Sequence, residues 1–139
     1  MTASALRSFR QISQRTEDTD RAVGFYRDVL GLELIARFGD LAFFDVDGIR
    51  LLLSAGSDAA GGPATSSVLY FTVHDIDAAR ATLEAAGVAF VDEPHLIFDD
   101  AAGTFGPAGQ QEWMTFFRDS EGNLLALSAR REGGPAIPA

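Results

Sequence analysis

Apolar side chains recur at helical spacing in residues 16–30, TEDTDRAVGFYRDVL. Acidic residues lie in the expected first turn, where they complement the helix dipole. Thr16 and Asp18 are both suitable N-caps, and the sequence leaves the choice between them open. Gly31 follows as a left-handed stop. The pattern therefore predicts a helix that ends next to Gly31.

A second stretch, residues 75–86 (DIDAARATLEAA), repeats this design, with Asp75 as the cap and Gly87 as the stop. Short runs rich in β-branched, aromatic and other apolar residues surround the two helices. They lie at residues 8–13, 32–38, 41–47 and 48–54 around the first helix, and at 67–73, 88–93, 113–119 and 122–128 around the second. The predicted order of elements is βαβββ, twice.

The two halves of the chain share a register, which indicates a duplicated module. Asp18 to Asp75 is 57 positions, Gly31 to Gly87 is 56, and both Gly48 to Gly122 and Ser54 to Ser128 are 74. The step from 56 to 74 requires 18 additional residues in the second copy. We assign them to a long loop at His95–Glu112.

The duplication predicts one domain over residues 1–139, made of two modules at about 8–54 and 67–129. Residues 55–66 are interpreted as a linker and residues 130–139 as a flexible tail, because both are of low complexity. With 139 residues, of which 47% are hydrophobic, the chain is long enough to bury a core of its own.

Charge and composition exclude several classes of protein. Basic residues number 11 against 20 acidic ones, and no basic cluster could follow a phosphate backbone, so neither nucleic acid nor an anionic membrane is an expected partner. The absence of cysteine excludes disulfides and thiolate chemistry and fits a reducing compartment. There is no signal-peptide core and no apolar run of about 20 residues. We predict a soluble cytoplasmic protein.

The run DTDRAVGFYRDVLGLEL followed by FFDVDGIRLLLS, and the run VLYFTVHDIDAARATLEAAGVAFV followed by FFRDSEGNLLALS, carry a family resemblance. From Arg10 to Ala129 the chain resembles the vicinal oxygen chelate superfamily, which includes glyoxalase I, bleomycin-resistance proteins, methylmalonyl-CoA epimerase and extradiol dioxygenases. The resemblance implies an α+β fold in which the mixed sheets of two βαβββ modules curl into a cup, with helices outside and a ligand inside. Members share this scaffold and differ in chemistry.

In the metalloenzymes of that superfamily, a divalent ion is held by one residue from the first strand and one from the last strand of each module. The resemblance places these positions on Gln11, Leu52, Val68 and Ala126. First-row metals need nitrogen, carboxylate or thiolate donors, usually three or more, whereas this set offers one amide oxygen and three hydrocarbons. We expect no metal site and no cofactor. Gln11 is either a hydrogen-bonding relic of such a site or a polar residue at a strand edge.

The two histidines are weighed separately. His74, in TVHDID, lies beside the predicted cap of the second helix and is interpreted as a surface residue. His95, in DEPHLIF, either touches a ligand or ends a strand, and we favour the strand end. No serine lies in a nucleophile elbow, and no glycine-rich phosphate loop is present.

Strand alternation sorts the remaining side chains into a set facing the helices and a set facing the cup. For residues 112–118 two assignments are open, and the resemblance favours Glu112, Met114 and Phe116 inside over Trp113, Thr115 and Phe117. Tyr70 adds a ring with a hydroxyl group, which suits a flat ligand. The predicted ligand-binding residues are Gln11, Arg50, Leu52, Val68, Tyr70, Glu112, Met114, Phe116 and Ala126.

These observations favour a metal-independent protein of the bleomycin-resistance type that binds a small aromatic or amphipathic molecule. Asp99 and Asp100 are expected near the ligand groove if the long loop forms its lid. The alternative is an enzyme of lyase, isomerase or epimerase type that uses an atypical metal site or side-chain acid–base chemistry, with Glu112, Tyr70 or His95 as candidate groups. A third hypothesis is a pseudoenzyme that binds another protein chain. The resemblance also implies a homodimer.

Overall fold

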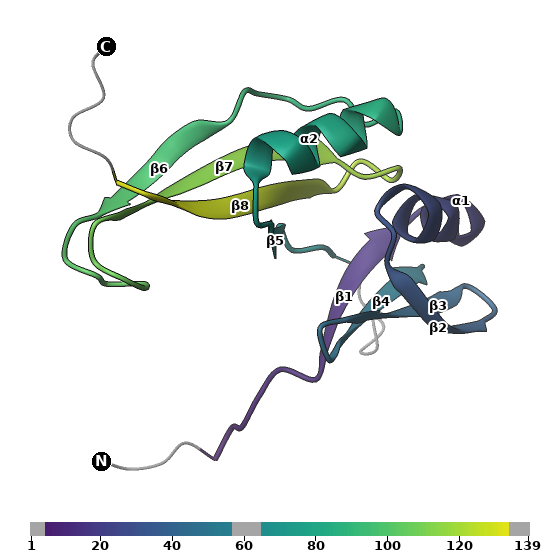
Figure 1. Ribbon diagram of the computed structural model, residues 1–139. Helices are drawn as coiled ribbons and strands as arrows, with labels where there is room; N and C mark the ends of the chain where they lie inside the picture. The colour runs from purple at the N-terminus through teal and green to yellow at the C-terminus, as the bar shows by residue number, and fades with distance from the viewer. Residues whose placement is uncertain (1–4, 57–64, 134–139) are drawn as a thin grey trace. The chain divides into compact units, whose positions relative to one another are not determined.

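The computed structural model describes residues 5–56 and 65–133 (Figure 1). The chain divides into two compact units, residues 1–67 and residues 68–139. The first unit contains the first predicted module and the second unit contains the second, so we refer to them as module 1 and module 2.

Module 1 is a four-stranded mixed sheet with a helix. Its elements are β1 (Gln11–Thr16), α1 (Thr19–Gly24), the π-helical turn η1 (Phe25–Val29), β2 (Glu33–Phe38), β3 (Leu41–Val46) and β4 (Ile49–Ala55). The strand order is β1-β4-β3-β2, with β1 parallel to β4 and the other neighbours antiparallel.

Module 2 repeats this topology. Its elements are β5 (Leu69–Thr72), α2 (Ile76–Ala85), β6 (His95–Asp100), β7 (Gln110–Arg118) and β8 (Leu124–Glu132). The strand order is β5-β8-β7-β6, again with one parallel pair, β5 and β8. The predicted α+β fold of two βαβββ modules is confirmed.

The helix ends follow from local chemistry. The Asp18 side chain accepts a hydrogen bond from Arg21 N at 3.1 Å, and the Asp75 side chain accepts from Asp77 N and Ala78 N, each at 3.1 Å. Of the two possible caps of the first helix, Asp18 is therefore the one used, and Thr16 is the last residue of β1. Gly31 and Gly87 follow the helices with φ of 76° and 99°, a conformation that glycine adopts without strain.

Each helix covers one face of its own sheet. In module 1 the buried side chains of α1 and η1 pack on the inward residues of β3 and β4: Ala22, Val23, Tyr26, Ala42, Phe44, Leu51 and Leu53. In module 2, α2 lies across β7 and β8 (Figure 1), over the buried residues Phe117, Leu125 and Leu127. Leu51, Leu53, Leu125 and Leu127, at alternate positions of the last strand in each module, are all buried.

The strand after α2 lies further along the chain than predicted. Residues 88–93 contribute only an isolated bridge, between Phe90 and Phe117, and β6 occupies the part of the chain that we assigned to a long loop. The reason is local: the Asp92 carboxylate accepts hydrogen bonds from Phe116 N at 2.8 Å and Thr115 Oγ1 at 3.0 Å. Side-chain bonds thus replace a strand ladder at Asp92, and the extra residues of module 2 lengthen a β-hairpin.

The predicted tail also begins too early. β8 runs to Glu132, where it pairs with Gln110, so residues 130–132 belong to a strand. The predicted strand at residues 8–13 likewise begins later, at Gln11. Residues 57–64 of the predicted linker and residues 134–139 of the predicted tail lie outside the described residues.

Asp100 holds the turn of the β6–β7 hairpin together. Its side chain is fully buried and accepts hydrogen bonds from Thr104 N at 2.6 Å, Phe105 N at 2.9 Å and Arg130 Nη2 at 2.8 Å. Burial by itself would raise the pKa of Asp100, but the Arg130 and backbone hydrogen bonds prevail and lower it to about 2. The Asp100 carboxylate is therefore engaged within the hairpin, and its position relative to a ligand groove stays a prediction.

We predict that Asp100→Asn destabilises the hairpin at neutral pH. A carboxylate with a folded pKa below its unfolded value of about 3.9 stabilises the folded state above that value, and this contribution is lost as the pH falls toward 2. The difference in unfolding free energy between wild type and variant should therefore be constant at neutral pH and shrink between about pH 4 and pH 2. Urea unfolding at several pH values measures it.

The neighbouring variant Asp99→Asn is the control, because Asp99 is exposed and makes none of these bonds in the described part of the chain. It should leave stability unchanged over the same pH range. If the difference in unfolding free energy between wild type and Asp100→Asn does not shrink between about pH 4 and pH 2, the role of Asp100 is contradicted.

Candidate functional site

The side of the module 2 sheet opposite α2 is here called the open face. Arg80 of α2 donates from Nη1 to Thr115 Oγ1 at 3.0 Å, so Thr115 points toward the helix. By alternation, Trp113 and Phe117 share the helix side, and Glu112, Met114 and Phe116 lie on the open face. Of the two assignments that the sequence left open for this strand, the structure has the one that the resemblance favoured.

Three of the predicted ligand-binding residues are neighbours across the open face. Ala126 of β8 lies between Tyr70 of β5 and Phe116 of β7 in the strand register. The rings of Tyr70 and Phe116 meet edge to face, with centroids 6.1 Å apart and an interplanar angle of 82°. Ala126 is fully buried, while Tyr70 stays 55% exposed. A small residue at position 126 thus lets two rings from different strands touch.

His95, the first residue of β6, extends this arrangement. It pairs with Met114, and its imidazole stacks on Phe116 with ring centroids 6.3 Å apart and an interplanar angle of 28°. We call Tyr70, Phe116 and His95 the aromatic row. His95 is a strand-end residue, as we favoured, and it also touches a residue predicted to bind the ligand.

Glu112 lies on the same face, two positions along β7 from Met114. Its Oε1 accepts a hydrogen bond from Ser128 Oγ at 3.2 Å, and its Oε2 is 3.9 Å from Arg130 Nη1. Because Arg130 also pairs with Asp100 at 2.8 Å, its charge is shared between two carboxylates. Glu112 is thus held within a local network on one side of the aromatic row.

The corresponding positions of module 1 differ in size. Leu52 of β4 lies between Ser13 of β1 and Phe43 of β3 in the strand register, where module 2 has Ala126 between Tyr70 and Phe116. Phe43 contacts Phe38 instead, with centroids 6.1 Å apart. The small and large residues are exchanged between the two copies, so module 1 has no equivalent of the Tyr70–Phe116 contact among its described residues.

The other predicted residues of module 1 are also neighbours. Gln11, at the start of β1, is exposed and lies opposite Arg50 of β4, which is exposed as well. Val68 of module 2 precedes β5 and is 39% exposed. On the first strand of each module, the residue opposite Leu52 is Ser13 and the residue opposite Ala126 is Tyr70. These lie two positions after Gln11 and Val68.

The residues at the four mapped metal positions do not fit a metal ion. Three are hydrocarbons, and Ala126 is covered by protein. Among the described residues, no group of three or more histidine, aspartate or glutamate side chains is arranged to hold a metal.

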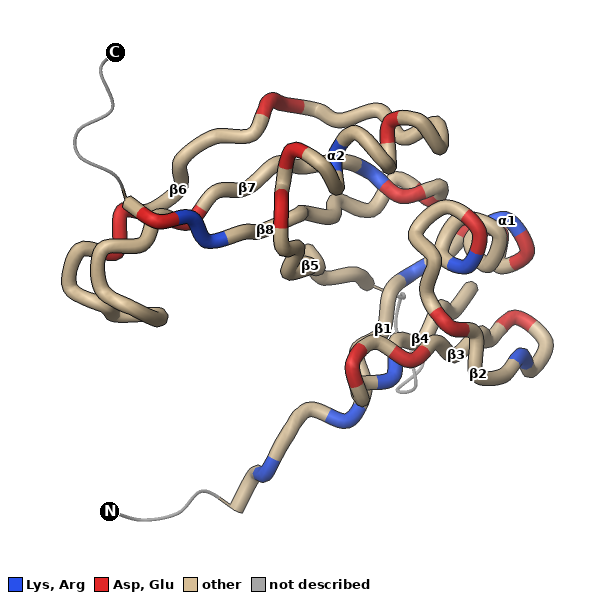
Figure 2. The backbone as a smooth tube through the Cα atoms, in the orientation of Figure 1, with Lys and Arg blue, Asp and Glu red and all other residues tan. Residues whose placement is uncertain are grey.

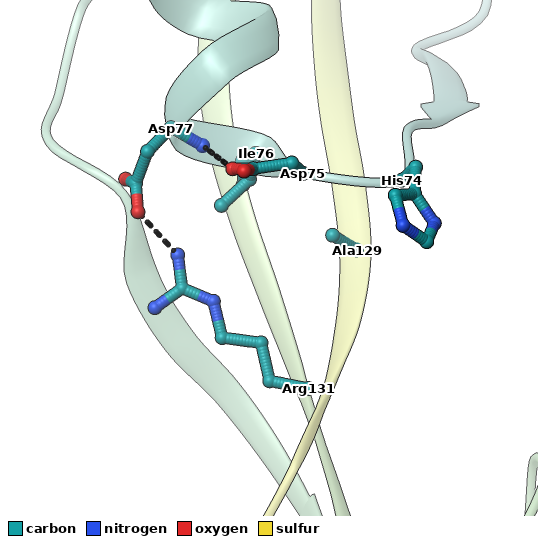
Figure 3. Close-up of a pocket in the computed structure, with 6 residues that line it drawn as sticks. All are labelled: His74, Asp75, Ile76, Asp77, Ala129 and Arg131. Atoms are coloured by element: carbon teal, nitrogen blue, oxygen red, sulfur yellow. Dashed lines mark hydrogen bonds and ion pairs between the residues drawn. The ribbon is translucent and has the colours of Figure 1, made fainter.

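A hollow of about 340 Å³ at the start of α2 is lined by His74, Asp75, Ile76, Asp77, Ala129 and Arg131 (Figure 3). The Asp75 carboxylate caps the helix, and the Asp77 carboxylate pairs with Arg131 at 2.9 Å. Ala129 and Arg131 lie on the helix side of β8, so His74 does not belong to the aromatic row. Both carboxylates of this hollow are thus engaged within the protein.

Charged residues are distributed over both modules (Figure 2). The two consecutive arginines, Arg130 and Arg131, pair with Asp100 and Asp77 at 2.8 and 2.9 Å. Within the described residues, no helix is long and apolar enough to cross a membrane.

Comparison with known families decides the classification. Residues 8–127 match the Glyoxalase/Bleomycin resistance protein/Dioxygenase superfamily. The chain belongs to this superfamily. The resemblance noted in the sequence is thereby confirmed, and it extends over both modules. No curated protein matches the chain in sequence.

Solved structures share the fold of this superfamily member. A lactoylglutathione lyase from Agrobacterium tumefaciens is 22% identical, with a TM-score of 0.71, and the match covers 91% of this chain and 96% of that one. A glyoxalase/bleomycin resistance protein/dioxygenase from Nocardioides is 21% identical, with a TM-score of 0.72, covering 99% and 92%. A virulence protein from Salmonella typhimurium is 19% identical, with a TM-score of 0.71, covering 91% and 98%. At these identities the likeness shows the fold alone.

Sequence reasoning did not find the contact between His95 and Phe116. Alternation predicts which residues of one strand share a face, but the neighbour in the next strand depends on the register. The register of β6 was missed because that strand was assigned to a loop. Alignment of the two copies did hold one signal for position 126. Ala126 stands where the first copy has the larger Leu52, whereas Phe116 and Phe43 are the same residue type.

We predict that Ala126→Leu destabilises the protein by about 1–3 kcal/mol, because a larger side chain must separate the Tyr70 and Phe116 rings. Chemical denaturation measures this change. Ala126→Gly is the control, and it should cost about 0.5–1 kcal/mol because it leaves the rings in contact. If Ala126→Leu is as stable as wild type, the two rings do not close over position 126.

Proposed function

We propose that this superfamily member binds a small planar aromatic molecule on the open face of module 2, without a metal ion. The observation that carries the proposal is the contact of Tyr70 with Phe116 over Ala126, at a position where the metalloenzymes of the superfamily have a metal ligand. The aromatic rings offer a flat apolar surface to a ligand, and the covered alanine offers no donor to a metal.

Exposure supports a ligand on this face. Tyr70 keeps 55% of its surface accessible although it contacts Phe116, and half of the His95 side chain (47%) is accessible too. Rings that a neighbour already holds in place lose little conformational entropy when a ligand packs on them. The Tyr70 hydroxyl adds a polar group beside the apolar surface. These features suit a molecule with a flat ring and a polar edge.

Catalysis through Glu112 is disfavoured, because this candidate acid–base group is already engaged within the protein. Glu112 accepts a hydrogen bond from Ser128 and lies near Arg130, so its carboxylate is engaged within the protein. A general base must be within hydrogen-bond reach of the proton that it removes. The homodimer and the cytoplasmic location remain predictions from the resemblance and the composition.

N-Methylindole is a suitable first probe, because it is flat and has no hydrogen-bond donor. We expect it to shift the NMR amide signals of β5, β7 and β8 around the aromatic row and to bind with saturable affinity. Tyr70→Ala should weaken this binding about tenfold, since it removes a ring contact worth roughly 1.4 kcal/mol.

Leu96→Ala is the matched control, because Leu96 is on β6 next to His95, is 44% exposed and pairs with Trp113 on the helix side. It should bind the probe like wild type. Binding that is absent, or that Tyr70→Ala and Leu96→Ala affect equally, would exclude the aromatic row as the site.

A metal measurement tests the other half of the proposal. Protein purified without added metal should contain well below one divalent ion per chain by mass spectrometry, because hydrocarbons occupy three of the four mapped positions. One equivalent of zinc, nickel or iron, released only by a strong chelator, would show that metal donors lie outside the four mapped positions. It would favour the alternative hypothesis of an enzyme with an atypical metal site.

A further inference from the structure

His95 is held in one orientation by its surroundings in module 2. Its Nδ1 is 2.9 Å from the Glu93 carbonyl oxygen and 3.7 Å from Asp92 Oδ2. The turn that carries these groups is itself fixed, because Arg80 donates to the Asp92 carbonyl at 2.5 Å and pairs with the Glu93 carboxylate at 3.6 Å. Stacking on Phe116 sets the plane of the imidazole.

This geometry determines the tautomer of the neutral ring. A carbonyl oxygen only accepts hydrogen bonds, so the contact with Glu93 requires the proton on Nδ1, and Asp92 favours the same arrangement. Nε2, across the ring, then carries a lone pair. No residue in the described ranges 5–56 and 65–133 gives it a hydrogen bond.

The imidazole that carries this lone pair belongs to the aromatic row. His95 stacks on Phe116, Phe116 contacts Tyr70, and 47% of the His95 side chain is exposed. A ring that packs against Phe116 therefore has a hydrogen-bond acceptor, oriented by the protein, at one end of the row. An oriented acceptor costs less entropy to engage than a mobile one.

We infer that His95 selects aromatic ligands that carry an N–H or O–H donor at the edge of the ring, with Nε2 accepting that hydrogen bond. The inference rests on the proposed function, because it assigns a specificity-determining residue to the same site. The ligand class is thus narrowed from planar aromatic molecules to those of indole or phenol type.

Indole and N-methylindole form a matched pair of probes, since they differ in the N–H donor and one methyl group. The quantity to measure by NMR titration is the ratio of their dissociation constants, in wild type and in His95→Phe. The variant keeps a ring against Phe116 and removes Nε2. We expect the preference for indole to fall about fivefold in His95→Phe, as the loss of one net hydrogen bond implies.

His95→Asn is the second variant, because its side-chain amide can donate to the Glu93 carbonyl while lacking a group at the place of Nε2. It should show the same loss of preference, and its amide spectrum reports whether the fold is intact. Leu96→Ala, on the other face of β6, should keep the wild-type ratio.

The outcomes separate this inference from the proposed function. If both probes bind in a manner that depends on Tyr70, but the ratio is the same in wild type and both His95 variants, the inference is wrong and the proposed function stands. If neither probe binds to wild type, both are wrong. A fivefold change confined to the His95 variants supports the inference.

Discussion

A helix packed on one face of each sheet is the constraint on which the rest of this structure depends. Burying Leu125 and Leu127 of β8 against α2 forces Ala126 to the opposite face, and burying Phe117 of β7 does the same to Phe116. The residues that remain on the open face do not pack against the helix. The aromatic row is built from this second set.

The two copies of the module differ in the sizes of the residues around the middle of the last strand, so their sheet faces differ. Both copies keep a phenylalanine beside the central position of the last strand, Phe43 in module 1 and Phe116 in module 2. Module 1 fills that central position with Leu52, next to the small Ser13, whereas module 2 has Ala126 next to the large Tyr70. Because side chains in contact must fill space without overlap, the smaller residue at 126 is what permits the Tyr70–Phe116 contact. One topology thus supports two surfaces.

Short polar side chains fix both ends of β6, in addition to its ladder with β7. Asp92 bonds to Thr115 and Phe116 before β6 begins, and Asp100 binds the turn and Arg130 where it ends. Both carboxylates therefore accept their hydrogen bonds within the protein. The Asp92 bonds fix the chain close to His95, which stacks on Phe116.

The amino-acid sequence by itself determined the two helices, the Asp75 cap and the repeated βαβββ order, since each depends on residues that are close together in the chain. It also determined which residues of one strand share a face, as Glu112, Met114 and Phe116 do, although the resemblance was needed to choose that face. Only the tertiary structure decided that Tyr70, Phe116 and His95 are neighbours, that β6 begins at His95, and that Asp100 is buried. The physical reason is that strand register and side-chain bonds such as that of Asp92 join residues far apart in the chain, and no local periodicity records them.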